Sequence, residues 1–96
     1  MGIDEIIGDK REAVMELAER HGARNLRVFG SVARGGAGSD SDLDLLVEMD
    51  DDRSLLDLIA LGQDLEELLG RPVDVITDRS VSRHLRGEIF GEAIAL

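Results

Sequence analysis

The chain has 96 residues, a formal net charge of −10, 2% aromatic residues and no cysteine. This length suffices for one domain with a single modest core, so we expect residues 1–96 to form one domain without a second substrate-binding domain. The negative charge disfavours long DNA or RNA as a substrate, and the scarcity of aromatic side chains removes the stacking platforms that bind single strands. A basic partner protein remains compatible with this charge.

The sequence shows no targeting or membrane segment. Its first residues carry acids where a signal peptide carries positive charge, and no apolar run approaches the roughly 18 residues of a membrane span. The lack of cysteine fits a reducing compartment. We therefore expect a soluble cytoplasmic protein that does not contact a membrane.

The first predicted element is an amphipathic helix from Ile3 to His21. Its apolar residues recur at three- and four-residue spacing between charged residues, and Gly22 ends it. His21 falls in the last turn, where an imidazolium interacts favourably with the helix dipole, so we interpret it as a capping residue and not a catalytic one. A first strand, Asn25–Phe29, follows.

A turn of small residues, Gly30 and Ser31, directly follows this strand. Glycine lets the backbone turn sharply and approach a ligand closely. If the next residues begin a short helix, its N-terminal N–H groups suit a phosphate, and the Ser31 hydroxyl adds a donor. Arg34 is either a charged phosphate contact or a solvated structural residue. Residues 35–40 form a glycine-rich loop, either a linker or a flap over the phosphate site. Asp40 lies in this loop and is interpreted as a turn residue and not as a ligand.

A second strand, beginning at Asp42, carries two carboxylates on one face. Successive strand residues alternate faces, so Asp42 and Asp44 share one side and the leucines and valine share the other. Converging carboxylates repel unless a cation lies between them, and Mg²⁺ prefers oxygen ligands that it shares with substrate phosphates. An Asp-x-Asp pair alone is also typical of a solvent-facing acidic edge. The interpretation of this pair as a metal site therefore depends on the Gly-Ser turn upstream.

The region after this strand predicts a turn and a long helix. Three aspartates at 50–52 indicate a solvated turn that also favours the N-terminus of the next helix. Ser54 with Asp57 predicts the helix start, and a leucine-rich stripe extends to Gly70. A helix of this length between two strands is the connection that a parallel crossover needs.

A third strand, Val73–Thr77, is predicted from its β-branched residues. Ser31 follows the first strand and Asp42 begins the second, so these two strands must be antiparallel for the turn and the carboxylates to meet. The third strand then runs parallel to the second and brings Asp74 to the same end as Asp42 and Asp44. We therefore expect three carboxylates to converge.

The C-terminal region predicts a last helix and an apolar end. Ser80 is a plausible N-cap, and apolar residues at helical spacing extend the helix to about Gly91. His84 is interpreted as a surface residue, with an acceptor or partner contact as the alternative. The apolar residues 93–96 either pack on the domain or meet another chain. The order of elements predicts an α/β (α+β) fold, with helices packed on a small mixed sheet of three to four strands.

Three motifs are spaced along residues 30–47: Gly30-Ser31, Ala33-Arg34-Gly35 and Ser41-Asp42-Leu43-Asp44-Leu45-Leu46-Val47. Their spacing resembles the signature of the DNA polymerase beta-like nucleotidyltransferase superfamily, most closely that of its minimal nucleotidyltransferases, and the resemblance spans nearly the whole chain. It departs at Val32, where many members carry a polar or basic residue, which leaves one of the family's phosphate contacts open.

The resemblance implies the polymerase-beta-like fold and two-metal nucleotidyl transfer. It assigns nucleotide binding to residues of the turn and the loop: Gly30, Ser31, Arg34 and Ser41. It assigns catalysis and the binding of two Mg²⁺ ions to the carboxylates Asp42, Asp44 and Asp74. Metals about 3.5–4 Å apart can stabilise the entering and leaving oxygens. Asp74 is the candidate to receive the acceptor's proton, although metal activation alone could suffice.

The resemblance also implies a partner. Minimal nucleotidyltransferases are often paired with a HEPN-domain protein, frequently a ribonuclease toxin, and some transfer AMP from ATP to a tyrosine hydroxyl of that partner. It therefore implies a protein adenylyltransferase of the MntA type that acts as the antitoxin of a HEPN toxin. The small size of the chain agrees with this reading, because it leaves little surface for selecting an acceptor.

Three other functions stay open from the sequence. The chain could neutralise a basic partner by binding alone, with the carboxylates as an acidic contact surface. It could act on a small molecule such as an aminoglycoside, although such transferases usually carry an additional acceptor domain. Modification of tRNA ends is opposed by the charge. An oligomer could form through the partner or through the C-terminal tail.

Overall fold

The computed structural model describes residues 2–36, 38, 42–81, 84 and 86–96. Its elements in chain order are α1 (Ile3–Ile6), η1 (Gly8–Lys10), α2 (Arg11–Arg20), β1 (Ala23–Phe29), α3 (Gly30–Ala33), β2 (Leu43–Met49), α4 (Leu55–Leu69), β3 (Val73–Thr77), η2 (Asp78–Ser80), α5 (Arg86–Glu92) and β4 (Ile94–Ala95). The predicted mixed α/β fold is confirmed.

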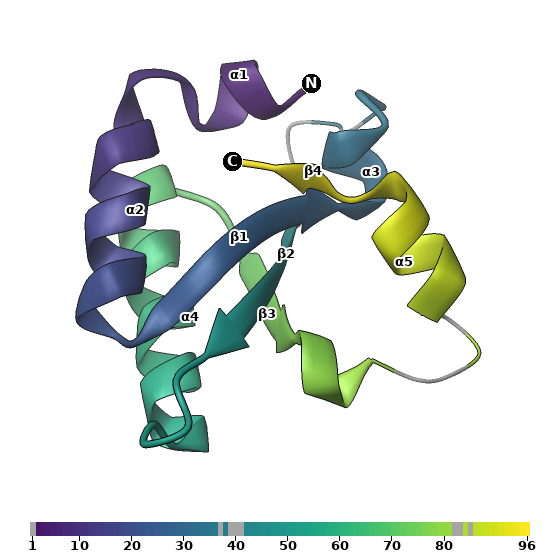
Figure 1. Ribbon diagram of the computed structural model, residues 1–96. Coiled ribbons are helices and arrows are strands. Elements are labelled where there is room, and N and C mark those ends of the chain that lie inside the picture. The colour runs from purple at the N-terminus through teal and green to yellow at the C-terminus, as the bar shows by residue number, and fades with distance from the viewer. Residues whose placement is uncertain (1, 37, 39–41, 82–83, 85) are drawn as a thin grey trace.

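The strands form one four-stranded mixed sheet in the order β3-β2-β1-β4. β1 pairs antiparallel with β2 and with β4, and β2 pairs parallel with β3 through the α4 crossover. The directions of the first three strands are those expected from the need to bring the turn and the carboxylates together. Figure 1 shows α2 and α4 on one side of the sheet and α5 on the other.

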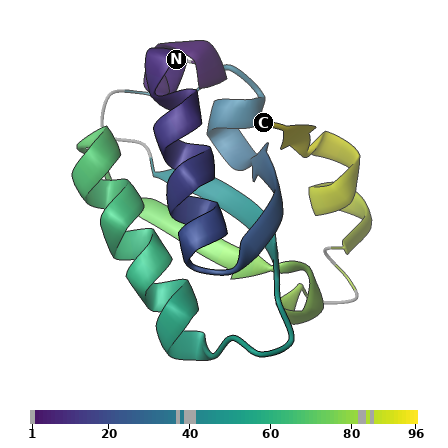
Figure 2. The same cartoon turned by 60° about the vertical axis from the view of Figure 1, so that its left-hand side comes forward.

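The core lies between the sheet and the pair α2 and α4, which run beside each other in Figure 2. Alternate residues of β2 point into this core, and fully buried side chains of both helices meet them. The apolar side chains of this layer include Val14, Ala18, Val28, Leu43, Leu45, Val47, Leu61 and Leu65. The alternation leaves Asp44, Leu46 and Glu48 on the opposite face of β2.

The N-terminal helix predicted as continuous is interrupted. Ile3–Ile6 and Arg11–Arg20 are α-helical, and a short 3₁₀ turn lies between them. Gly8 has a φ of +49°, which an α-helix does not accommodate, so the chain breaks there. The apolar periodicity on either side of Gly8 concealed this break.

The middle helix follows its sequence signals. Ser54 is the N-cap of α4, and its backbone N–H donates to Asp57 Oδ2 at 2.9 Å. Gly70 ends the helix with a φ of +68°. In the preceding acidic run, Asp51 and Asp52 are exposed as expected, and Asp51 pairs with Arg79 at 2.9 Å. Asp50 is half-buried and pairs with Arg24.

The C-terminal region differs from the prediction at its start. Ser80 lies at the end of η2, where its N–H donates to Thr77 Oγ1, and α5 begins only at Arg86. The apolar end packs on the domain, because β4 pairs with β1, and the N–H of Leu96 donates to the carbonyl of Leu26 at 3.1 Å. Among the described residues, no helix has the length and apolar character needed to cross a membrane.

Candidate active site

The turn after β1 and the start of β2 meet at one end of the sheet. Phe29 pairs with Asp44 across the antiparallel strands, and Gly30 begins α3 with a φ of +75°. A Cβ at Gly30 would lie 2.3 Å from Asp44 Oδ2, so the missing side chain leaves room for this carboxylate. Glycine is needed here both for the backbone conformation and for the close approach.

The second and third carboxylates lie beside Asp44. Asp74 of β3 is its direct partner in the parallel register, and Asp42 immediately precedes β2, which begins one residue later than predicted. The pKa of Asp44 is raised, first by burial and then by the negative charges of Asp74 and Asp42. The structure therefore brings the three predicted carboxylates close enough for their charges to interact.

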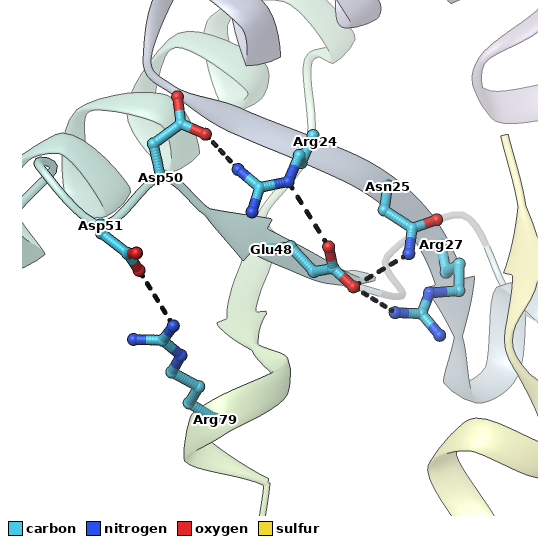
Figure 3. Close-up of polar contacts among 7 residues, drawn as sticks. All are labelled: Arg24, Asn25, Arg27, Glu48, Asp50, Asp51 and Arg79. Carbon is cyan, nitrogen blue, oxygen red and sulfur yellow. Dashed lines mark hydrogen bonds and ion pairs between the residues drawn. The ribbon is translucent and has the colours of Figure 1, made fainter.

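Unlike these carboxylates, the acidic side chain at the other end of the same sheet face is paired with basic residues. There, Glu48 accepts a hydrogen bond from Asn25 at 3.1 Å and lies 3.6 Å from Arg24 Nε and 3.9 Å from Arg27 (Figure 3). Within the described part of the chain, neither Asp44 nor Asp74 has an ion pair of this kind. The positive charge of Arg34 acts on Asp44 but does not outweigh burial and the neighbouring carboxylates, and like charges at close range are typical of functional sites.

The donor set fits a divalent cation, although a formed metal cluster is not seen. Among the residues that the structure describes, no three acidic or histidine side chains are arranged to hold a metal ion. Carboxylate oxygens are the ligands that Mg²⁺ prefers. A cation would favour the ionised form of Asp44, whose pKa is raised by burial and then by the neighbouring carboxylates. The assignment of Asp42, Asp44 and Asp74 as metal ligands stays a prediction.

Two groups predicted to contact phosphate instead donate hydrogen bonds to a carboxylate that the sequence did not indicate. Glu92, at the end of α5, accepts a hydrogen bond from the backbone N–H of Gly30 at 3.0 Å and from Arg34 Nη1 at 2.9 Å. These contacts lower the pKa of Glu92, the Gly30 N–H most strongly. Arg34 therefore contacts an anionic group beside the turn, and no motif could have linked it to a glutamate 58 residues away.

The other candidates fall into three groups. Ser31 lies in α3, next to Gly30, as the prediction requires. Val32 is 1% exposed and packs in the core, so it anchors α3 and cannot reach a bound phosphate. Ser41 and Asp40 lie outside the described residues.

The two histidines lie away from the carboxylates. His21 is the C-cap of α2, one residue beyond the end of the helix instead of in its last turn, and its Nε2 lies 2.6 Å from Asp64 Oδ2 on α4. It therefore ties the two core helices together, which supports a structural role. His84 is exposed, in agreement with its interpretation as a surface residue.

Known proteins are similar to this chain in sequence. A family model described as "Nucleotidyltransferase domain" matches residues 10–96. A relative from Methanocaldococcus jannaschii, provisionally named a protein adenylyltransferase, is 39% identical over 98% of this chain and 97% of its own length. Protein adenylyltransferase MntA of Thermococcus cleftensis is 42% identical over 82% of this chain and 80% of its own length.

Solved structures show the same fold. One, provisionally described as a minimal nucleotidyltransferase, is 50% identical with a TM-score of 0.87 and covers 100% of this chain and 97% of its own. A toxin–antitoxin structure with AMP-PNP has a TM-score of 0.75 over 88% of this chain and 69% of its own. At 23% identity, the second similarity is one of fold.

Proposed function

This chain belongs to the nucleotidyltransferase domain family and is a nucleotidyltransferase, and we propose that it transfers AMP from ATP to a hydroxyl group of a partner protein. The proposed partner is a HEPN-domain toxin in the cytoplasm, the proposed acceptor is a tyrosine, and the transfer makes this chain the antitoxin. Magnesium is the proposed metal.

One observation carries the proposal: the carboxylate of Asp44 lies directly against Gly30, with Asp74 as its neighbour across β2 and β3. A metal held by Asp44 and Asp74 would therefore lie beside backbone and arginine donors suited to phosphate. Nucleotidyl transfer needs metal ligands and phosphate donors in one small region, because the metal and the donors bind the same triphosphate group.

The roles of the chain's own residues follow from their positions. Asp42, Asp44 and Asp74 would hold Mg²⁺, which supplies charge stabilisation at the phosphoryl oxygens when bound. The Gly30 N–H and Arg34 would orient the terminal phosphates. The acceptor oxygen forms a bond to the α-phosphorus, and the bond to pyrophosphate breaks. The hydroxyl proton passes to Asp74, an exposed carboxylate on the edge strand β3.

A protein acceptor is supported by the charge of the chain and by its relatives. A net charge of −10 favours a basic protein surface over a nucleic acid. Among the relatives, MntA is named a protein adenylyltransferase, and the fold also occurs in a toxin–antitoxin structure with AMP-PNP. These names support the choice of acceptor class and of the adenine nucleotide.

The proposal is tested by incubating the purified chain with Mg²⁺, ATP labelled at the α-phosphate, and the product of the neighbouring gene. We expect label on the partner, lost on addition of a chelator and reduced at least 100-fold by Asp44→Asn. Asp52→Asn, the same change in an exposed turn, is the matched control and keeps full activity.

Two other outcomes would change the conclusion. Neutralisation of the partner without label, unaffected by Asp44→Asn, would make this chain an antitoxin that acts by binding alone. Label on a small molecule and none on any protein would move the acceptor to the small-molecule class. Either result overturns protein adenylylation.

A further inference from the structure

The C-terminal helix places a carboxylate on the donors of the proposed phosphate site. Glu92 is the last residue of α5, and each of its carboxylate oxygens accepts a different hydrogen bond. Oε1 accepts from the backbone N–H of Gly30, and Oε2 accepts from the guanidinium of Arg34. Its side chain is 31% exposed, so solvent reaches this contact from one side. A carboxylate held by an amide and an arginine is bound as a phosphate would be.

The backbone N–H of Gly30 cannot serve Glu92 and a phosphate together. A backbone N–H points in one direction and makes one strong hydrogen bond. Two anions on the same donors would also repel each other beside Asp44, whose ionisation Glu92 already opposes. Binding of a phosphate at Gly30 therefore requires the carboxylate of Glu92 to leave.

We propose that Glu92 is a built-in competitor of the nucleotide, which the triphosphate must displace from Gly30 and Arg34 before transfer can begin. The inference rests on the proposed function, because it concerns the same donors. In the free protein, Glu92 occupies the phosphate donors, and the strength of this contact partly sets the affinity for ATP.

The surroundings of α5 allow the carboxylate to move without loss of the helix. Phe90 lies against the guanidinium groups of Arg27 and Arg86, 4.9 Å and 5.1 Å from its ring centre, and holds α5 on β1. Ile94 and Ala95 pair with β1 on the other side of Glu92. Because the helix is fixed at both ends of this segment, rotation of the Glu92 side chain is sufficient.

The test compares the wild-type chain with Glu92→Gln, which removes the charge and keeps the shape. Binding of ATP with Mg²⁺, and separately of inorganic tripolyphosphate, is measured by isothermal titration calorimetry. We expect Glu92→Gln to bind both about 5- to 20-fold more tightly, because a neutral amide holds Arg34 less strongly than a carboxylate does. Adenosine, which has no phosphate, should show no such gain.

Glu88→Gln is the matched control, since Glu88 lies one turn earlier on α5, is exposed, and changes the net charge equally. Its affinity should stay within twofold of the wild type, which separates the contact from the general effect of charge. Circular dichroism establishes that both variants are folded. If Glu92→Gln does not fold, Glu92→Asp draws the carboxylate back by one methylene and should give a smaller gain.

The outcomes separate this inference from the proposed function. If the wild type binds ATP and labels its partner but Glu92→Gln binds no more tightly than Glu88→Gln, the competitor role is wrong and the transferase proposal stands. A weaker affinity in Glu92→Gln would make Glu92 a positioning residue for Arg34 and would also overturn the inference. If neither protein binds ATP, both proposals fail.

Discussion

Replacing Gly30 by alanine tests whether the site depends on the close contact between the turn and Asp44. The new Cβ would lie 2.3 Å from Asp44 Oδ2, whereas ordinary contact begins at 3.4 Å, so the carboxylate must move by about 1 Å. A shift of about 1 Å in a reacting group costs roughly 100-fold in rate. An L-residue at a φ of +75° also costs about 1–2 kcal/mol of folding free energy.

Gly70→Ala provides the control for the loss of folding free energy that alanine causes at a positive φ. Gly70 has a φ of +68°, but a Cβ there meets no atom within 4 Å. Both variants should lose about 1–2 kcal/mol in urea unfolding, while only Gly30→Ala should lose about 100-fold in AMP transfer to the partner. Equal activity of the two variants would show that Asp44 does not depend on Gly30, and the proposed geometry would be refuted.

Three further changes separate the site from the scaffold. Asp44→Asn should stabilise the metal-free protein by about 1 kcal/mol at pH 7, measured by urea unfolding. The pKa of Asp44 is raised in the fold, so the wild type loses its penalty as the carboxylate protonates, and the gain from Asp44→Asn should shrink as the pH falls toward 4. His21→Ala should cost about 1–3 kcal/mol in the same assay by leaving Asp64 without its partner, and an equal loss from His21→Ala in an Asp64→Ala background would contradict this. Arg79→Ala should change stability by less than about 0.5 kcal/mol, because its pair with Asp51 is exposed, and a larger loss in thermal unfolding would contradict this.

The order and direction of the main strands could be predicted because the chemistry and the periodicity agreed. The first two strands had to be antiparallel for Gly30 to meet Asp44, and the long α4 implied a parallel third strand. The break at Gly8 could not be predicted, because a glycine in a helical pattern is compatible with either a continuous or a broken helix. The register irregularity in β1 near Asn25, with a φ of +54°, also had no clear signal in the sequence.

The candidate site could be predicted where the contacts are local and not where they are distant. Gly30, Asp42 and Asp44 lie within 15 residues, and alternation along β2 defines their common side. Asp74 required only the crossover rule. Glu92 was missed because its contact with Arg34 depends on where α5 returns to the sheet, and the sequence placed the start of that helix too early.

The position of the site explains how the fold tolerates it. Asp44 and Asp74 are partners in the register of β2 and β3, on the sheet face opposite to that of the buried Leu43 and Leu45 that pack in the core. Leu43 and Leu45, on either side of Asp44, are fully buried, so the strand cannot rotate to move its carboxylate away from Asp74. The cost of bringing like charges together is therefore offset by apolar burial that does not depend on the site. Because a one-residue change of register would move both leucines out of the core, the same packing that stabilises the domain fixes the separation of Asp44 and Asp74.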